Sequence, residues 1–117
     1  MYDPSHPRAS VTEARRLFRD GEAVLVDVRE ADEFRAGHIP GALHIPLARL
    51  ESVSAARHLG TAQRLVLVCR SGNRSRQAVA LLAEHGVTAV DVIGGMRDWA
   101  AQGLPVADAH GAPGIVV

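Results

Sequence analysis

The stretch LVLVCRSGNRSRQAVALL, residues 65–82, decides the fold of this chain. It opens with an apolar run that predicts a buried strand over Leu65–Cys69, and it closes with apolar residues at helical spacing. Between them, CRSGNRS at 69–75 contains the only cysteine, together with a glycine and two arginines. The stretch therefore predicts a strand, a tight loop and a helix, with the cysteine at the carboxyl end of the strand.

Strands and helices alternate along the rest of the chain. Strands are predicted over 23–28, 43–45, 65–69 and 89–93, and helices over 11–20, 30–36, 47–58, 74–85 and 96–102. In the helix over 74–85 we expect Ala78, Leu81 and Leu82 to face inward. This alternation predicts an α/β fold with a mainly parallel central sheet and helices on both faces. Ligands in such folds gather at the carboxyl ends of strands, where Cys69 lies.

Length and composition suit a single soluble domain. We expect the domain over 9–106, between an irregular lead-in at 1–8 and a tail at 107–117 that is loose unless Ile115–Val117 docks. Among the 117 residues, 47% are hydrophobic, and 13 basic side chains balance 13 acidic ones. This balance gives no signal for nucleic acid or for a membrane. With no predicted signal peptide or spanning segment, we expect a cytoplasmic monomer or homodimer.

The cysteine loop has the composition of an anion site. A loop that enters a helix N-terminus directs backbone N–H groups at one point, and Gly72 permits the backbone angles that this requires. Arg70 and Arg74 add positive charge, and together these features favour a reactive thiolate at Cys69. The alternative is a buried cysteine that packs as a small hydrophobe. Three arginines within seven residues, Arg76 included, favour the reactive interpretation.

CRSGNRS resembles the active-site loop of the rhodanese domain, and further motifs agree along nearly the whole chain. These are LVDVRE at 25–30, EF at 33–34, GHIPGALHIP at 37–46 and VIGGMRDWAAQGLPV at 92–106. The resemblance implies a three-layer rhodanese-like fold and a sulfurtransferase that carries sulfur as a persulfide on Cys69. The anion-binding residues that it implies are those of the loop: Arg70, Ser71, Gly72, Asn73, Arg74 and Ser75.

The resemblance also implies the reactants. The donor is a small molecule such as thiosulfate or a persulfide, and the acceptor is a thiol, a thiol-carrying protein or cyanide. No cofactor and no metal are expected. In the family, the acid and arginine that correspond to Asp27 and Arg29 form ion pairs that support the loop, and we expect Glu33 to join them.

Several other residues have structural interpretations that we prefer to functional ones. Phe34 is expected in the core, and Trp99 in the core or at the rim of a pocket. His38 and His44 lie among turn residues without a recognised spacing of metal ligands, so hydrogen bonds to loop backbone are expected of them. Gly94-Gly95 lacks the context of a dinucleotide-binding motif and is interpreted as a turn.

Two other functions remain open at the level of sequence. A cysteine phosphatase or arsenate reductase also places a thiolate in an anion-binding loop, but tyrosine phosphatases need five residues between cysteine and arginine. Here four separate Cys69 from Arg74, and Arg76 comes one position too late. A binding module with this fold and no turnover is the other alternative, although such relatives usually lose the cysteine that this chain retains.

Overall fold

The computed structural model describes residues 8–50 and 64–117, and its centre is a five-stranded parallel sheet. The strands are β1 (Arg8–Ala9), β2 (Ala23–Asp27), β3 (Leu43–His44), β4 (Arg64–Val68) and β5 (Ala89–Val92). Their order across the sheet is β1-β5-β4-β2-β3. All four pairings are parallel, with Leu25 opposite Val66 and Val66 opposite Val90 in the middle.

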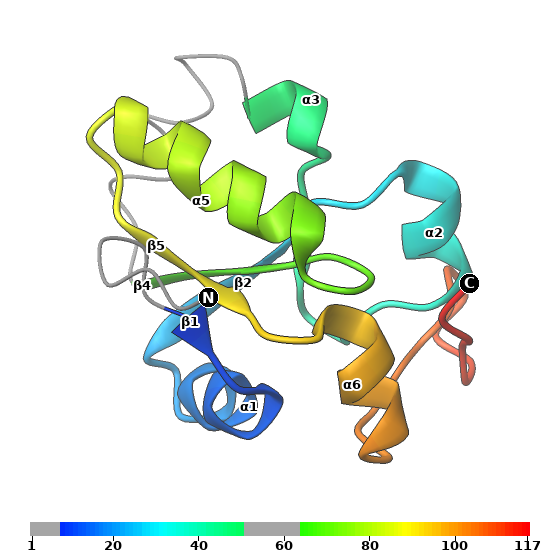
Figure 1. Ribbon diagram of the computed structural model, residues 1–117. Coiled ribbons are helices and arrows are strands. Elements are labelled where there is room, and N and C mark those ends of the chain that lie inside the picture. The colour runs from blue at the N-terminus through cyan, green and yellow to red at the C-terminus, as the bar shows by residue number, and fades with distance from the viewer. Residues whose placement is uncertain (1–7, 51–63) are drawn as a thin grey trace.

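Helices cover both faces of this sheet (Figure 1). The helices are α1 (Val11–Arg19), α2 (Ala31–Ala36), α3 (Leu47–Leu50), α5 (Asn73–Glu84) and α6 (Gly95–Ala101). Successive side chains of a strand point to opposite faces. Leu65 and Leu67 of β4 accordingly belong to a core that includes residues of α5, whereas Val66 belongs to a core that includes residues of α1 and α6. The predicted α/β fold with three layers is confirmed.

Most predicted elements agree with the structure to within one or two residues, and three details differ. The two-residue strand β1 was not predicted, because Arg8 was assigned to the lead-in. In α5, Val79 is buried together with Ala78 and Leu82, whereas Leu81, which we expected to face inward, is only half-buried. Of the helix predicted over 47–58, the first four residues form α3, and positions 51–63 lie outside the described residues.

The C-terminal segment packs against the domain beside α2 and α6 (Figure 1). Ala107 pairs with His38, the Ile115 amide donates to the Ala36 carbonyl at 2.9 Å, and Val116 packs against the core between the sheet and α1. A Cβ atom at Gly37 would collide with the Ile115 backbone, so only glycine permits this close approach. The segment therefore docks, which is the alternative that the sequence left open for Ile115–Val117, and it does not form a loose tail.

The cysteine loop follows the central strand of the sheet, at the end where the parallel strands have their carboxyl termini. Strand β4 lies between β5 and β2, so the loop after β4 is flanked by the segments that lead to α6 and to α2. From β2 the chain proceeds to β3 on one side, and from β4 it proceeds to β5 on the other. Parallel sheets bind ligands where the chain diverges in this way. Among the described residues, no helix is long and apolar enough to cross a membrane.

Candidate active site

Cys69 lies directly after β4 with its sulfur held inside the loop. The residue is 1% exposed, and Sγ accepts a hydrogen bond from the Gly72 amide at 3.0 Å. The Ser75 hydroxyl, which is also buried, lies 3.4 Å from Sγ. An amide donor is available whether the sulfur is a thiol or a thiolate, but it stabilises the anion more. The loop thus holds the thiol sulfur beside a fixed donor at the start of α5.

Gly72 permits this arrangement through its backbone angle. It adopts φ 108°, the left-handed region that residues with a Cβ rarely enter, and it forms the N-cap of α5. A Cβ at this position would also approach Arg8 Nη2 to 3.2 Å and the Gly94 amide to 3.4 Å. The predicted role of Gly72 in shaping the loop therefore has a geometric basis in the structure.

The Ser75 hydroxyl has two acceptors within reach. It donates to the Gly72 carbonyl at 3.3 Å and lies within range of Cys69 Sγ. A hydroxyl carries one hydrogen, so it can serve only one acceptor at a time. A thiol can itself donate to the Ser75 oxygen, whereas a thiolate only accepts. Loss of the thiol proton would therefore turn the hydroxyl toward the sulfur and give the anion a second donor.

The start of α6 supports the loop from the other side. The Met96 amide donates to the Cys69 carbonyl at 2.7 Å, and the Arg97 amide donates to the Arg70 carbonyl at 2.9 Å. A Cβ on Gly95 would collide with the Cys69 carbonyl oxygen. Gly94 and Gly95 both have positive φ angles, in agreement with the predicted turn. These glycines let the first N–H groups of a helix satisfy the backbone of the cysteine loop.

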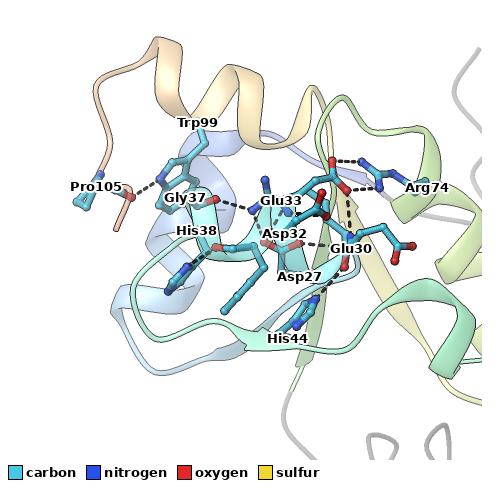
Figure 2. Close-up of polar contacts among 12 residues, drawn as sticks. Asp27, Glu30, Asp32, Glu33, Gly37, His38, His44, Arg74, Trp99 and Pro105 are labelled. Carbon is cyan, nitrogen blue, oxygen red and sulfur yellow. Dashed lines mark hydrogen bonds and ion pairs between the residues drawn. The ribbon is translucent and has the colours of Figure 1, made fainter. Parts of the chain in front are cut away.

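Arg74 forms an ion pair with Glu33 of α2, as Figure 2 shows. Its two terminal nitrogens donate to the two carboxylate oxygens at 2.6 and 2.8 Å. The Arg74 hydrogen bonds lower the pKa of Glu33 from its usual 4.5 to about 2, and the Glu33 hydrogen bonds raise the pKa of Arg74. The pair joins α2 to the first turn of α5. Arg74 was predicted to attract anions, but in this arrangement its charge is balanced.

Asp27 and Arg29 form a second ion pair, which is more deeply buried than the first. Both residues are 0% exposed, and Arg29 Nη2 donates to Asp27 at 2.7 Å and to the Gly37 carbonyl at 2.7 Å. Arg29 Nη1 has no hydrogen-bond partner among the described residues. The guanidinium therefore connects the end of β2 to the end of α2. Glu33, which we expected to join this pair, hydrogen-bonds with Arg74 and with the Glu30 amide instead.

The remaining loop side chains point outward. Arg70, Ser71 and Asn73 are exposed, and no acidic group among the described residues forms a salt bridge with Arg70. Arg70 is therefore the loop cation whose charge is open to a ligand. The side chains of Ser71 and Asn73 make no hydrogen bond to the sulfur among the described residues, and their part in anion binding stays a prediction.

The two candidate histidines have structural partners (Figure 2). His38 Nδ1 lies 2.7 Å from the Phe34 carbonyl, and His44 Nε2 lies 2.8 Å from the Arg29 carbonyl. Phe34, expected in the core, is half-buried and stacks on both imidazole rings, with centroids 3.9 and 4.5 Å away. The described residues contain no group of histidine, cysteine and carboxylate that could hold a metal ion. Trp99 is buried, as predicted, and donates to the Pro105 carbonyl.

Sequence reasoning missed two features of the site. It did not pair Glu33 with Arg74, which lie 41 positions apart. It also gave no role to Arg97, whose amide binds the loop backbone and whose side chain lines a pocket with that of Arg70. The only signal in the sequence was that Glu33, Arg74 and Arg97 all lie within motifs that resemble the rhodanese domain.

Comparisons with known proteins agree with this fold. The model of the rhodanese-like domain family matches residues 10–102. Human thiosulfate:glutathione sulfurtransferase is 39% identical over 106 residues, which cover 80% of this chain and 92% of that protein. Maize (Zea mays) adenylyltransferase and sulfurtransferase MOCS3-1 is 40% identical over 103 residues. A rhodanese-related protein from Thermoplasma volcanium superposes with a TM-score of 0.78 at 28% identity, covering 87% of this chain and 98% of that one.

The chain therefore belongs to the rhodanese-like domain family, and the predicted rhodanese-like fold is confirmed. It spans only part of several curated relatives that it matches. It covers 22% of the maize protein, against 82% of its own length, and 45% of the putative sulfur carrier protein YrkF from Bacillus subtilis.

Proposed function

We propose that this protein is a sulfurtransferase that carries sulfur as a persulfide on Cys69. The observation that supports this most is the position of Sγ, 3.0 Å from the Gly72 amide and 3.4 Å from the Ser75 hydroxyl at the start of α5. Both donors suit a sulfur anion, and the family match places the loop in a domain found in proteins named as sulfurtransferases.

The reaction consists of two exchanges in which atoms and electrons balance. In the first, the Cys69 thiolate attacks the outer sulfur of thiosulfate, the sulfur–sulfur bond of the donor breaks, and sulfite leaves with that electron pair. In the second, an acceptor thiolate attacks the outer sulfur of the Cys69 persulfide. The new bond forms as the bond to Sγ breaks, and Cys69 is again a thiolate. Neither step needs an external oxidant or reductant.

Two properties of the loop favour sulfur over phosphate. Four residues separate Cys69 from Arg74, one fewer than in tyrosine phosphatases, and the Arg74 guanidinium is bound to Glu33. A phosphate ester would need a wide ring of amides and an arginine free to hold two oxygens. A cysteine that is 1% exposed instead favours a donor that presents one terminal atom.

The acceptor in this proposal is a thiol. The human relative's name gives thiosulfate and glutathione as its reactants, and the names of other relatives include a sulfur carrier protein. A low-molecular-weight thiol or a thiol-carrying protein is accordingly proposed here, with cyanide as a laboratory substitute. Cys69 is the only cysteine of the chain, so no second cysteine in it can discharge the persulfide, and the acceptor must come from outside.

The Cys69→Ser variant tests the proposal. We expect wild-type protein treated with thiosulfate to gain the mass of one sulfur atom, and to lose it when a thiol is added. The serine variant should gain nothing, transfer no sulfur to cyanide and keep the wild-type circular dichroism spectrum. The same preparations are assayed with p-nitrophenyl phosphate. A wild-type protein that stays unloaded but hydrolyses this ester would replace the proposal with the phosphatase alternative.

A further inference from the structure

A shallow pocket lies beside the cysteine loop, between α6 and the C-terminal segment. Its volume is about 390 Å³, and its lining includes Arg70, Arg97, Val106, Ile115 and Val116. Arg70 follows Cys69 directly, and the Arg97 amide binds the Arg70 carbonyl at 2.9 Å, so the two arginines are held next to each other. One residue that lines the pocket, Arg70, is therefore the immediate sequence neighbour of Cys69. The volume of the pocket falls within the range of small-molecule sites, roughly 300–1,000 Å³.

The charge of this pocket is unbalanced. Both arginines are exposed, neither forms a salt bridge among the described residues, and no acidic side chain is among the described residues that line the pocket. A second pocket, beside β1 and α5, is lined by Arg8 and Arg76 but also by Asp91, which pairs with Arg8 at 3.0 Å. Both arginines of the pocket beside the cysteine loop are thus open to an anion, whereas in the second pocket one of the two arginines, Arg8, is already paired.

The opposite wall is apolar and belongs to this chain's own C-terminal segment. Val106, Ile115 and Val116 lie beyond residue 102, where the match to the family model ends. Hydrogen bonds from Ile115 to Ala36 and from Gly114 to Val106 fix this wall in place. A ligand that fits must therefore combine a negative group with a short hydrocarbon part.

We propose that Arg97, together with Arg70, binds the carboxylate of the acceptor thiol and so determines which thiols accept the sulfur. The inference rests on the function proposed above and adds the chemical class of the acceptor, a low-molecular-weight thiol that carries a carboxylate. Its methylene groups lie against Val106 and Ile115, and its sulfur attacks the persulfide of Cys69. Arg97 acts here on specificity, because it touches the acceptor but not the sulfur that moves.

Two thiols of similar size test the proposal, 3-mercaptopropionate with a carboxylate and 3-mercapto-1-propanol with a hydroxyl. The quantity measured is the ratio of their kcat/KM values as acceptors from the loaded enzyme. We expect Arg97→Ala to lower this ratio about 3- to 10-fold, the range for loss of one partly exposed charged contact. Arg97→Lys, which keeps the positive charge, should retain most of the wild-type ratio. The wild-type ratio should also fall as salt is added, because these charges are open to water.

Arg76→Ala is the matched control, since it removes an exposed arginine near the loop that does not line this pocket. An unchanged ratio in Arg97→Ala, or an equal fall in Arg76→Ala, would overturn the proposal. A second measurement needs no sulfur transfer: the rate of Cys69 alkylation by iodoacetate relative to neutral iodoacetamide. This ratio of alkylation rates should fall in Arg97→Ala and stay at the wild-type value in Arg76→Ala. If the protein never loads sulfur, the proposed function fails by itself, and the alkylation ratio still decides whether the pocket attracts a carboxylate.

Discussion

Two ion pairs lie beside the cysteine loop, and they differ in burial rather than in chemistry. Asp27 and Arg29 have 0% exposed side chains, whereas Glu33 is 17% and Arg74 is 32% exposed. Both pairs have a carboxylate that accepts from a guanidinium at 3.0 Å or less. Water can replace part of the outer pair's interaction but none of the inner pair's. We infer that the inner pair maintains the fold and that the outer pair adjusts the loop.

The largest effect is expected when the inner pair is broken on one side. Asp27→Asn removes the carboxylate charge and leaves the buried Arg29 guanidinium without compensation, in addition to the Nη1 that already lacks a partner among the described residues. Such a loss costs about 3–5 kcal/mol in free energy of unfolding, a large part of the roughly 5–15 kcal/mol of a typical domain. Urea unfolding followed by circular dichroism measures it.

A double variant keeps this prediction testable if Asp27→Asn does not fold. Asp27→Leu with Arg29→Met removes both charges and leaves apolar groups of similar size, so much of the lost stability should return. A single variant that costs under about 1 kcal/mol, or a double variant worse than Asp27→Asn, would show that the inner pair is not the support inferred here.

A smaller effect on stability, with a larger effect on activity, is expected for the outer pair. Arg74→Ala should lower the free energy of unfolding by about 1 kcal/mol, because the pair is partly exposed. It should also raise the KM for thiosulfate, since a positive charge near Cys69 is lost. Glu33→Gln should lower that KM, because it frees the guanidinium for an anion. If both variants raise the KM equally, Arg74 acts only by holding α2 against the loop.

The sequence predicted the central strands and the cysteine loop because both depend on local patterns. Leu65–Val68 is apolar throughout, and Gly72 is placed where a loop must turn into a helix. The two-residue strand β1 was missed because Arg8 and Ala9 show no periodicity, and pairing with β5 alone defines them. Which residues of α5 are buried also depends on tertiary packing. Val79 is buried where the pattern predicted Leu81, because the way α5 packs on the sheet cannot be read from the pattern alone.

The charge partners of the site were harder to predict than its location. Arg74 was expected to face an anion, and nothing local indicates that Glu33, 41 residues earlier, takes the guanidinium. Likewise, Arg70 and Arg97 come together only because α6 binds the backbone of the cysteine loop. A motif thus predicts which residues gather at a strand end, whereas the pairing among them is a property of the folded chain.

The smallest expected effect is the loss of folding stability in acid that comes from the outer pair, Glu33 and Arg74. The pKa of Glu33 is about 2 in the folded protein against its usual 4.5, because Arg74 hydrogen-bonds to the carboxylate. A lowered folded-state pKa means that the pair stabilises the protein fully above about pH 4.5, and that this contribution fades as the pH falls toward 2. Contacts with Arg16 and with backbone amides also lower the pKa values of Glu13 and Asp108, so wild-type protein loses stability in acid for several reasons.

The difference between wild type and Arg74→Ala removes those other contributions, because Glu13 and Asp108 titrate alike in both proteins. In the variant, the pKa of Glu33 should return toward 4.5, so its protonation costs the fold little. Urea midpoints measured from pH 7 to pH 2.5 should therefore differ by a constant amount above pH 4.5 and converge below it. A difference that stays constant down to pH 2.5 would mean that Arg74 stabilises the protein through the packing of its side chain, and that the outer pair contributes little as an ion pair.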